Sequence, residues 1–173
     1  MVKGMKTLIY TALAGALLWA CQEREAAQPS DFTGNESAYA LMAGSDYPVS
    51  GTVTFKEKKD GTTQISIALT GTDGNIQMPV HLHLGNTATD AAAVAAFLTP
   101  VTSKNGVSET LLTRLGDETP ITYEQLITMN ACIKIHLGEA GPDKDIIIAA
   151  GDIGKAAESA SSGRIGISVC KSE

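Results

Sequence analysis

The sequence predicts a mainly β protein, a two-sheet Greek-key β-sandwich with one or two short helices. Seven or so short segments after Pro48 alternate apolar and polar residues, with the period of two that marks a half-buried strand. Turn-forming pairs such as Asp60-Gly61 and Asn105-Gly106 separate these segments, and the chain holds 17 glycines. Helical patterns are few and short. An antiparallel sandwich satisfies these observations, and an open barrel is the nearest alternative.

The first predicted strands form a meander. Val53 and Phe55 alternate with polar residues before the first turn, and the stretch Ile65 to Leu69 alternates in the returning strand. Between residues 77 and 84, one face is apolar and the other carries His81 and His83. Further strands are predicted at residues 107–112, 131–137, 146–150 and 164–170.

Two segments have helical signals. The alanine-rich stretch 87–98, which precedes Pro100, predicts a short helix. Thr122 and Gln125 have the spacing of a capping box and predict a second helix over residues 123–129.

The N-terminus has the layout of an export signal. Lys3 and Lys6 precede an apolar run from Thr7 to Ala20, and Cys21 follows directly. The run of about fourteen residues is shorter than the ~20 that span a bilayer, so we expect cleavage and not a retained membrane helix. We therefore divide the chain into a signal at 1–20, a flexible tether at 21–47 and one β domain at 48–173. Within the tether, packing of Tyr39 to Met42 on the domain is the alternative.

A cysteine at the cleavage point resembles the lipobox of bacterial lipoproteins. This resemblance implies a lipid on Cys21, a mature protein anchored to a membrane, and a domain that faces the periplasm or the cell surface. Trp19 is untypical of a lipobox, so cleavage by an ordinary signal peptidase is the alternative. Removing residues 1–20 would take the formal charge from −6 to −8, because it removes two lysines and no acid. Such an acidic chain does not predict nucleic-acid binding.

The cysteines and histidines supply the candidate chemistry. Cys132 and Cys170 form an even pair in an exported chain, which suggests a disulfide; two buried thiols are the alternative. The chain has three histidines, and His81 and His83 share one strand face. His136, in a similar Ile-His-Leu segment, completes a three-nitrogen site if its strand lies beside theirs. Such a site suits copper, with zinc as second choice, and leaves one position open; histidines on a wet strand face are the alternative.

Several segments together resemble the CHRD domain, named for chordin and also present in exported bacterial proteins. CHRD domains have an early hairpin, then a His-x-His strand, a short helix and a later strand with a histidine. The corresponding segments here are Val49 to Leu69, Pro79-Val80-His81-Leu82-His83, the Tyr-Glu-Gln-Leu helix and Ile133-Lys134-Ile135-His136.

A second resemblance is to the copper/zinc superoxide dismutases, which are Greek-key sandwiches whose copper is held partly by a His-x-His strand and a later strand histidine. It implies a copper half-site at most, because no histidine lies between His83 and His136 to serve as the bridging ligand. It also implies a disulfide between Cys132 and Cys170 and an anion-guiding role for Arg164. The predicted sandwich is therefore immunoglobulin-like or superoxide dismutase-like.

These observations lead to one expected function and two alternatives. We expect a lipid-anchored binding module whose partners are the membrane and a metal ion or a protein. The first alternative is a copper-dependent oxidoreductase of the dismutase type, in which Arg164 or Lys134 attracts the superoxide anion. The second is a metal-free protein-interaction domain. Motifs for a nucleophilic serine, a P-loop or a dinucleotide fold are absent from the sequence.

Overall fold

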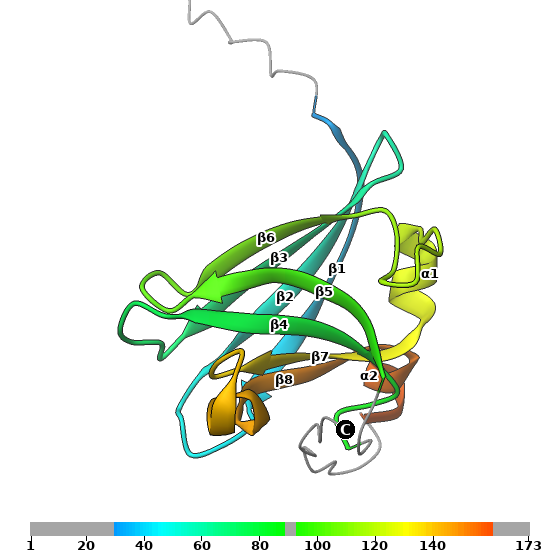
Figure 1. Ribbon diagram of the computed structural model, residues 1–173. Helices are drawn as coiled ribbons and strands as arrows, with labels where there is room; N and C mark the ends of the chain where they lie inside the picture. Colours follow the sequence, from blue (N-terminus) through cyan, green and yellow to red (C-terminus); the bar gives the residue numbers. More distant parts are fainter. Residues whose placement is uncertain (1–29, 89–92, 161–173) are drawn as a thin grey trace, which may run out of the picture.

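The computed structural model describes residues 30–88 and 93–160. Over these residues the chain is mainly β, with two short α-helices and one 3₁₀ helix, which confirms the predicted class (Figure 1). The predicted signal, Cys21, Arg164, Cys170 and the strand expected at 164–170 lie outside the described residues. The strands are β1 (Phe32–Ala43), β2 (Ser50–Lys58), β3 (Thr63–Thr70), β4 (Gln77–Leu84), β5 (Val94–Thr102), β6 (Val107–Leu112), β7 (Asn130–His136) and β8 (Ile147–Gly154).

The strands form one closed antiparallel barrel. Their order around the barrel is β1-β2-β3-β6-β5-β4-β7-β8, and β8 pairs with β1 to close it (Figure 1). Within this order β3 lies beside β6 and β7 lies beside β4, so each pairs with a strand that is not its neighbour in the sequence. The long connection from β6 to β7 therefore brings β7 next to β4, the strand that carries two of the three histidines.

The closed barrel replaces the two separate sheets that the sequence predicts. β5 joins β6 through one residue pair, Thr102 with Val107, and β1 joins β8 through two, whereas every other neighbouring pair of strands shares five to eight. Two four-stranded halves thus meet at two short seams. Alternation of apolar and polar residues could not reveal these seams, because a sandwich and a barrel both turn every second residue inward.

Strand β1 lies in the stretch that the sequence analysis assigns to the tether. Residues 32–43 pair with β2, so the barrel begins well before Pro48 and the predicted boundary is too late. Ser37, Tyr39 and Leu41 turn inward while their neighbours are exposed. The period of two was present, but the small and polar residues around it made the stretch look unstructured.

The barrel interior is the hydrophobic core, and a helix covers one end of it. Phe55, Ile65, Leu82 and Ile133 are among its fully buried side chains. Helix α1 (Tyr123–Thr128) begins with the predicted capping box, in which the Thr122 and Gln125 side chains bond each other's backbone N–H.

Tyr123 ties this end cap to the first strand. The Tyr123 side chain is buried, and its hydroxyl forms a hydrogen bond of 2.8 Å with the Ser37 hydroxyl of β1. Helix α1 is therefore held over the end of the barrel by a polar contact in addition to its apolar packing.

The helix that the sequence predicts over residues 87–98 is wrong for its second half. Residues 94–98 belong to strand β5, which pairs with β4 along most of its length. Alanine favours helix in isolation, but this stretch also buries Ala95, Ala96 and Leu98 against the core. Tertiary pairing therefore outweighs the local preference of alanine.

One buried hydroxyl in the barrel has no hydrogen-bond partner. The Thr63 side chain is fully buried, and its Oγ1 contacts no donor or acceptor. We expect Thr63→Val to raise the free energy of unfolding by about 1 kcal/mol in urea denaturation, because valine keeps the shape and removes the desolvated oxygen. Thr110→Val is the matched control with the opposite sign, since the Thr110 Oγ1 accepts a 2.8 Å bond from the Thr99 N–H. Equal destabilisation by both variants would contradict this expectation.

Candidate metal centre

The three histidines of the chain come together on the outer wall of the barrel. His81 and His83 lie on β4 and His136 lies at the end of β7, the neighbouring strand. Each ring offers a nitrogen, and these three nitrogens all lie within 4.8 Å of one another. The predicted meeting of the two histidine strands is therefore confirmed.

The alternation of β4 explains why its histidines share a face. Val80 and Leu82 point into the core, so the residues between and after them point outward. The register of β4 with β5 shifts between Leu82 and His83, and that of β7 with β8 shifts between Ile135 and His136. Such irregularities change the direction of side chains, and here they flank two of the three histidines.

The histidine cluster is largely shielded from water. His83 is 1% exposed and His136 is 3% exposed, whereas His81 is only half-buried. The alternative of three histidines on a wet strand face is therefore wrong for two of them. Ring centroids lie 4.7 Å apart for His81 and His136, 5.7 Å for His81 and His83, and 6.3 Å for His83 and His136.

The ring of His136 is oriented by the chain that follows it. Its Nδ1 lies 2.7 Å from the main-chain carbonyl of Lys144. A carbonyl only accepts, so Nδ1 donates the proton and Nε2 keeps its lone pair. This Nε2 is buried and has no hydrogen-bond partner. A metal ion is the partner that such an orphaned nitrogen fits, and a backbone carbonyl on the other nitrogen is the usual support of a metal-binding histidine.

The surroundings of His81 and His136 favour the neutral form of their imidazoles. Burial lowers the pKa of His81 from 6.5 to about 4, and the neighbouring His136 and His83 act in the same direction. Burial also lowers the pKa of His136, helped by the Lys134 charge and opposed by the Lys144 bond and the Asp145 carboxylate. Neutral imidazole is the form that binds a metal, so no proton has to be displaced near pH 7.

The lowered pKa of His81 predicts an acid-sensitive fold in the metal-free protein. An unfolded His81 takes up a proton below pH 6.5, whereas the folded one stays neutral until about pH 4. The unfolded state therefore binds more protons, and stability falls as the pH drops through this window. After screening by solvent we expect this residue to contribute on the order of 1 kcal/mol. Urea denaturation at both ends of the window should show a smaller pH dependence in His81→Gln, and an unchanged one would contradict the assignment.

The loop from β7 to β8 places negative charge beside the cluster. It includes the 3₁₀ helix η1 (Gly141–Asp145), and residues 139–145 carry three carboxylates and one ammonium group. Asp145 is close enough to His136 to act on its pKa. This loop favours the approach of a cation over that of an anion.

Two other residues that the sequence predicts to be functional, Cys132 and Lys134, lie within the part of the chain that the structure describes. Cys132 is buried and pairs with His83 across β4 and β7, but its sulfur is outside the three-nitrogen cluster. Its predicted disulfide stays a prediction, since Cys170 lies beyond the described residues. Lys134, named as an anion-attracting group, is fully buried opposite His81.

Two features of the site have no reliable sequence signal. The Lys144 carbonyl is a main-chain group, so the identity of its residue does not reveal it. Phe97 pairs with His81 across β4 and β5, and its ring meets the His81 ring edge-on at a centroid distance of 4.9 Å. The helix expected over this stretch hid that contact.

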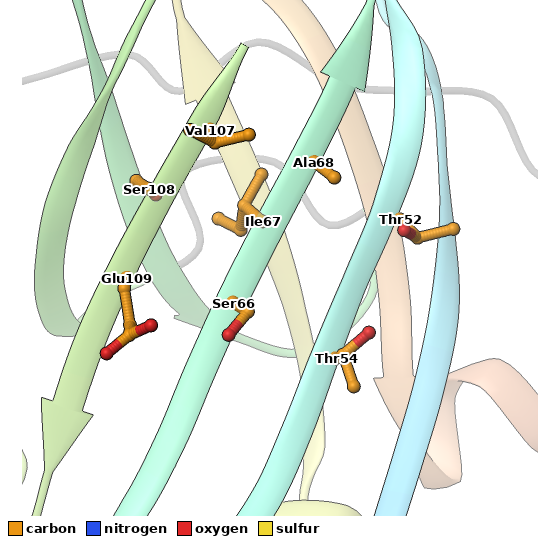
Figure 2. Close-up of a pocket in the computed structure, with 8 residues that line it drawn as sticks. All are labelled: Thr52, Thr54, Ser66, Ile67, Ala68, Val107, Ser108 and Glu109. Atoms are coloured by element: carbon orange, nitrogen blue, oxygen red, sulfur yellow. The ribbon is translucent and has the colours of Figure 1, made fainter. Parts of the chain in front are cut away.

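A second surface feature lies on the opposite wall of the barrel. A shallow groove of about 360 Å³ crosses the outer face of β2, β3 and β6, where small side chains lie side by side (Figure 2). Glu109 is the single titratable residue in its lining. The groove holds no cluster of ligand atoms comparable with the histidines.

A search for membrane-spanning helices in the described residues and comparisons of the sequence with known proteins give no match. Across residues 30–88 and 93–160, no helix combines the length and apolar character needed to cross a bilayer. The sequence matches no protein-family model, and the comparison with curated proteins gives no match.

Proposed function

We propose that the protein is an exported, lipid-anchored binding module that holds one copper ion on His81, His83 and His136. The observation that carries the proposal is the convergence of three ring nitrogens within 4.8 Å, one of them buried and without a partner. Two of the three imidazoles are buried, and buried histidines that converge in this way are uncommon unless they bind a ligand.

The donor set favours copper. It consists of three imidazole nitrogens, with no carboxylate or thiolate among the ligand atoms that converge. Imidazole suits copper and zinc, and the affinity of nitrogen sites is higher for Cu²⁺ than for Zn²⁺. Three protein ligands also leave a fourth position for an exchangeable ligand. Zinc is therefore the second choice.

Binding without turnover fits the surroundings better than a dismutase-like reaction. A dismutase needs a route that attracts superoxide, whereas residues 139–145 add net negative charge next to His136. Of the two candidates for attracting an anion, Lys134 is the one that the structure describes, and it is fully buried. The copper-dependent oxidoreductase remains the alternative, and a superoxide-consumption assay on the copper-loaded chain separates the two.

The resemblance to CHRD domains is part of the proposal. It is supported by the position of the His-x-His strand directly beside the later histidine strand. It is also supported by the short capped helix that precedes that later strand. Under this proposal the barrel positions the three histidines, and the histidines bind the metal ion.

The direct test is a metal titration of the full chain in detergent. We expect Cu(I) and Cu(II) to bind with a stoichiometry of one and a Kd well below about 1 μM, with Zn(II) weaker. His83→Gln supplies the background, and circular dichroism verifies that the variant folds. Weak binding that His83→Gln leaves unchanged would contradict the proposal and favour the metal-free interaction domain.

The anchor is tested separately. We expect radiolabelled palmitate to enter the wild-type protein in bacterial cells and labelling to be lost in Cys21→Ser, because the thiol is the acceptor of the lipid. The same variant should move from the membrane fraction to the soluble exported fraction. Label retained by Cys21→Ser would overturn the anchor and leave the metal site untouched.

A further inference from the structure

Phe97 is a large apolar side chain that is exposed to solvent beside the histidine cluster. It lies on the outward face of β5 and is 72% exposed, so core packing does not account for it. Its ring meets that of His81 nearly at right angles, with the centroids 4.9 Å apart. Val94, which is also exposed and lies on β5 like Phe97, pairs with His83 of β4. The β5 side of the cluster is thus bordered by apolar groups.

The burial of the ligands defines where solvent reaches the cluster. His83 and His136 are almost fully covered, and His81 alone of the three is half-exposed. Water and exchanging ligands therefore approach along His81. Because Phe97 is the direct cross-strand neighbour of His81 on β5, it borders this approach.

We infer that Phe97 is an apolar cover of the copper site and biases it toward Cu(I) over Cu(II). The inference rests on the proposed function, since it concerns the same three histidines. Phe97 is a specificity-determining residue in this scheme and not a ligand.

The physical reason lies in the different needs of the two ions. Cu(II) prefers a tetragonal set of nitrogen and oxygen ligands, so with three imidazoles it needs a further ligand such as water. Cu(I) carries less charge, and its desolvation therefore costs less. An apolar ring beside the solvent-facing ligand restricts water and lowers the local dielectric, which penalises Cu(II) more.

The test compares the ratio of Cu(I) to Cu(II) affinity in four full-length chains. Cu(I) affinity is measured anaerobically by competition with bicinchoninate, and Cu(II) affinity by competition with nitrilotriacetate. The chains are the wild type, Phe97→Leu, Phe97→Gln and Leu111→Gln. Leu111 is 56% exposed on β6, a strand that pairs with neither of the histidine strands β4 and β7, so its variant controls for the loss of an exposed apolar side chain.

The expected results separate apolar cover from other effects. Phe97→Gln should lower the Cu(I)/Cu(II) affinity ratio roughly tenfold, as substitutions around a metal site commonly do. Phe97→Leu should keep most of the ratio, and Leu111→Gln should keep all of it. A ratio that Phe97→Gln leaves unchanged, or that both Phe97 variants lose equally, overturns the inference while the copper site stands. A wild type that binds neither ion overturns the proposed function itself.

Discussion

Replacing His136 with alanine is expected to weaken copper binding roughly a thousandfold, equivalent to about 4 kcal/mol. The His136 ring is held by the 2.7 Å bond from its Nδ1 to the Lys144 carbonyl. Its loss would leave two ligands on β4 and a cavity where the third ring stood. Competition titration with a copper chelator measures the change, and circular dichroism confirms that the barrel is retained.

Lys144→Ala is the matched control for His136. The bond to His136 uses the main-chain carbonyl, which alanine keeps, so we expect the copper Kd of this variant to stay within about threefold of the wild type. A thermal scan gives a second measure, because bound copper should raise the Tm of the wild type and of Lys144→Ala but not of His136→Ala. Comparable affinity in all three chains would remove His136 from the ligand set.

Gly151→Ala is expected to lower the free energy of unfolding by about 3 kcal/mol or more. Gly151 lies on β8 opposite β1, and a Cβ at this position would approach the Ala40 carbonyl oxygen and the Leu41 side chain. The Ala40 oxygen belongs to the backbone and cannot swing away, so one strand has to move. The clash falls at the seam where two residue pairs join β1 to β8. Urea denaturation should show a lower midpoint.

Gly116→Ala controls for the glycine substitution. An added Cβ there would meet the Ala95 carbonyl oxygen at 3.4 Å, an ordinary contact, so we expect a change within about 0.5 kcal/mol. Equal loss of stability in both variants would contradict the close strand approach as the cause, because alanine by itself lowers the entropy of the unfolded chain and favours folding.

The sequence predicts the histidine strands well, because the patterns that mark them lie within each strand. Alternation alone puts His81 and His83 on one face, and the similar Ile-His-Leu segment marks His136 as a third member. The pairing of β4 with β7 joins segments that are far apart in the sequence. Local patterns do not predict this pairing, so the three-histidine site depends on it as an assumption.

Closure of the barrel and the start of the domain are harder to predict for two different physical reasons. Closure depends on three residue pairs at the two seams, and nothing in Thr102 or Val107 distinguishes a seam from a hairpin. Strand β1 alternates as the other strands do, but its inward residues include Ser37, which pairs with Tyr123 rather than with apolar neighbours. A local pattern cannot anticipate a partner that lies far along the chain.

The order of the strands around the barrel has a kinetic consequence for metal binding. Hairpins such as β2 with β3 close early, because their residues are near in sequence, whereas β7 reaches β4 only after the β4-β5-β6 meander and α1 have been passed. The three imidazoles therefore converge late, and a nascent chain has no complete chelate to offer. We therefore expect a bound ion to stabilise the folded barrel chiefly by lowering its rate of unfolding.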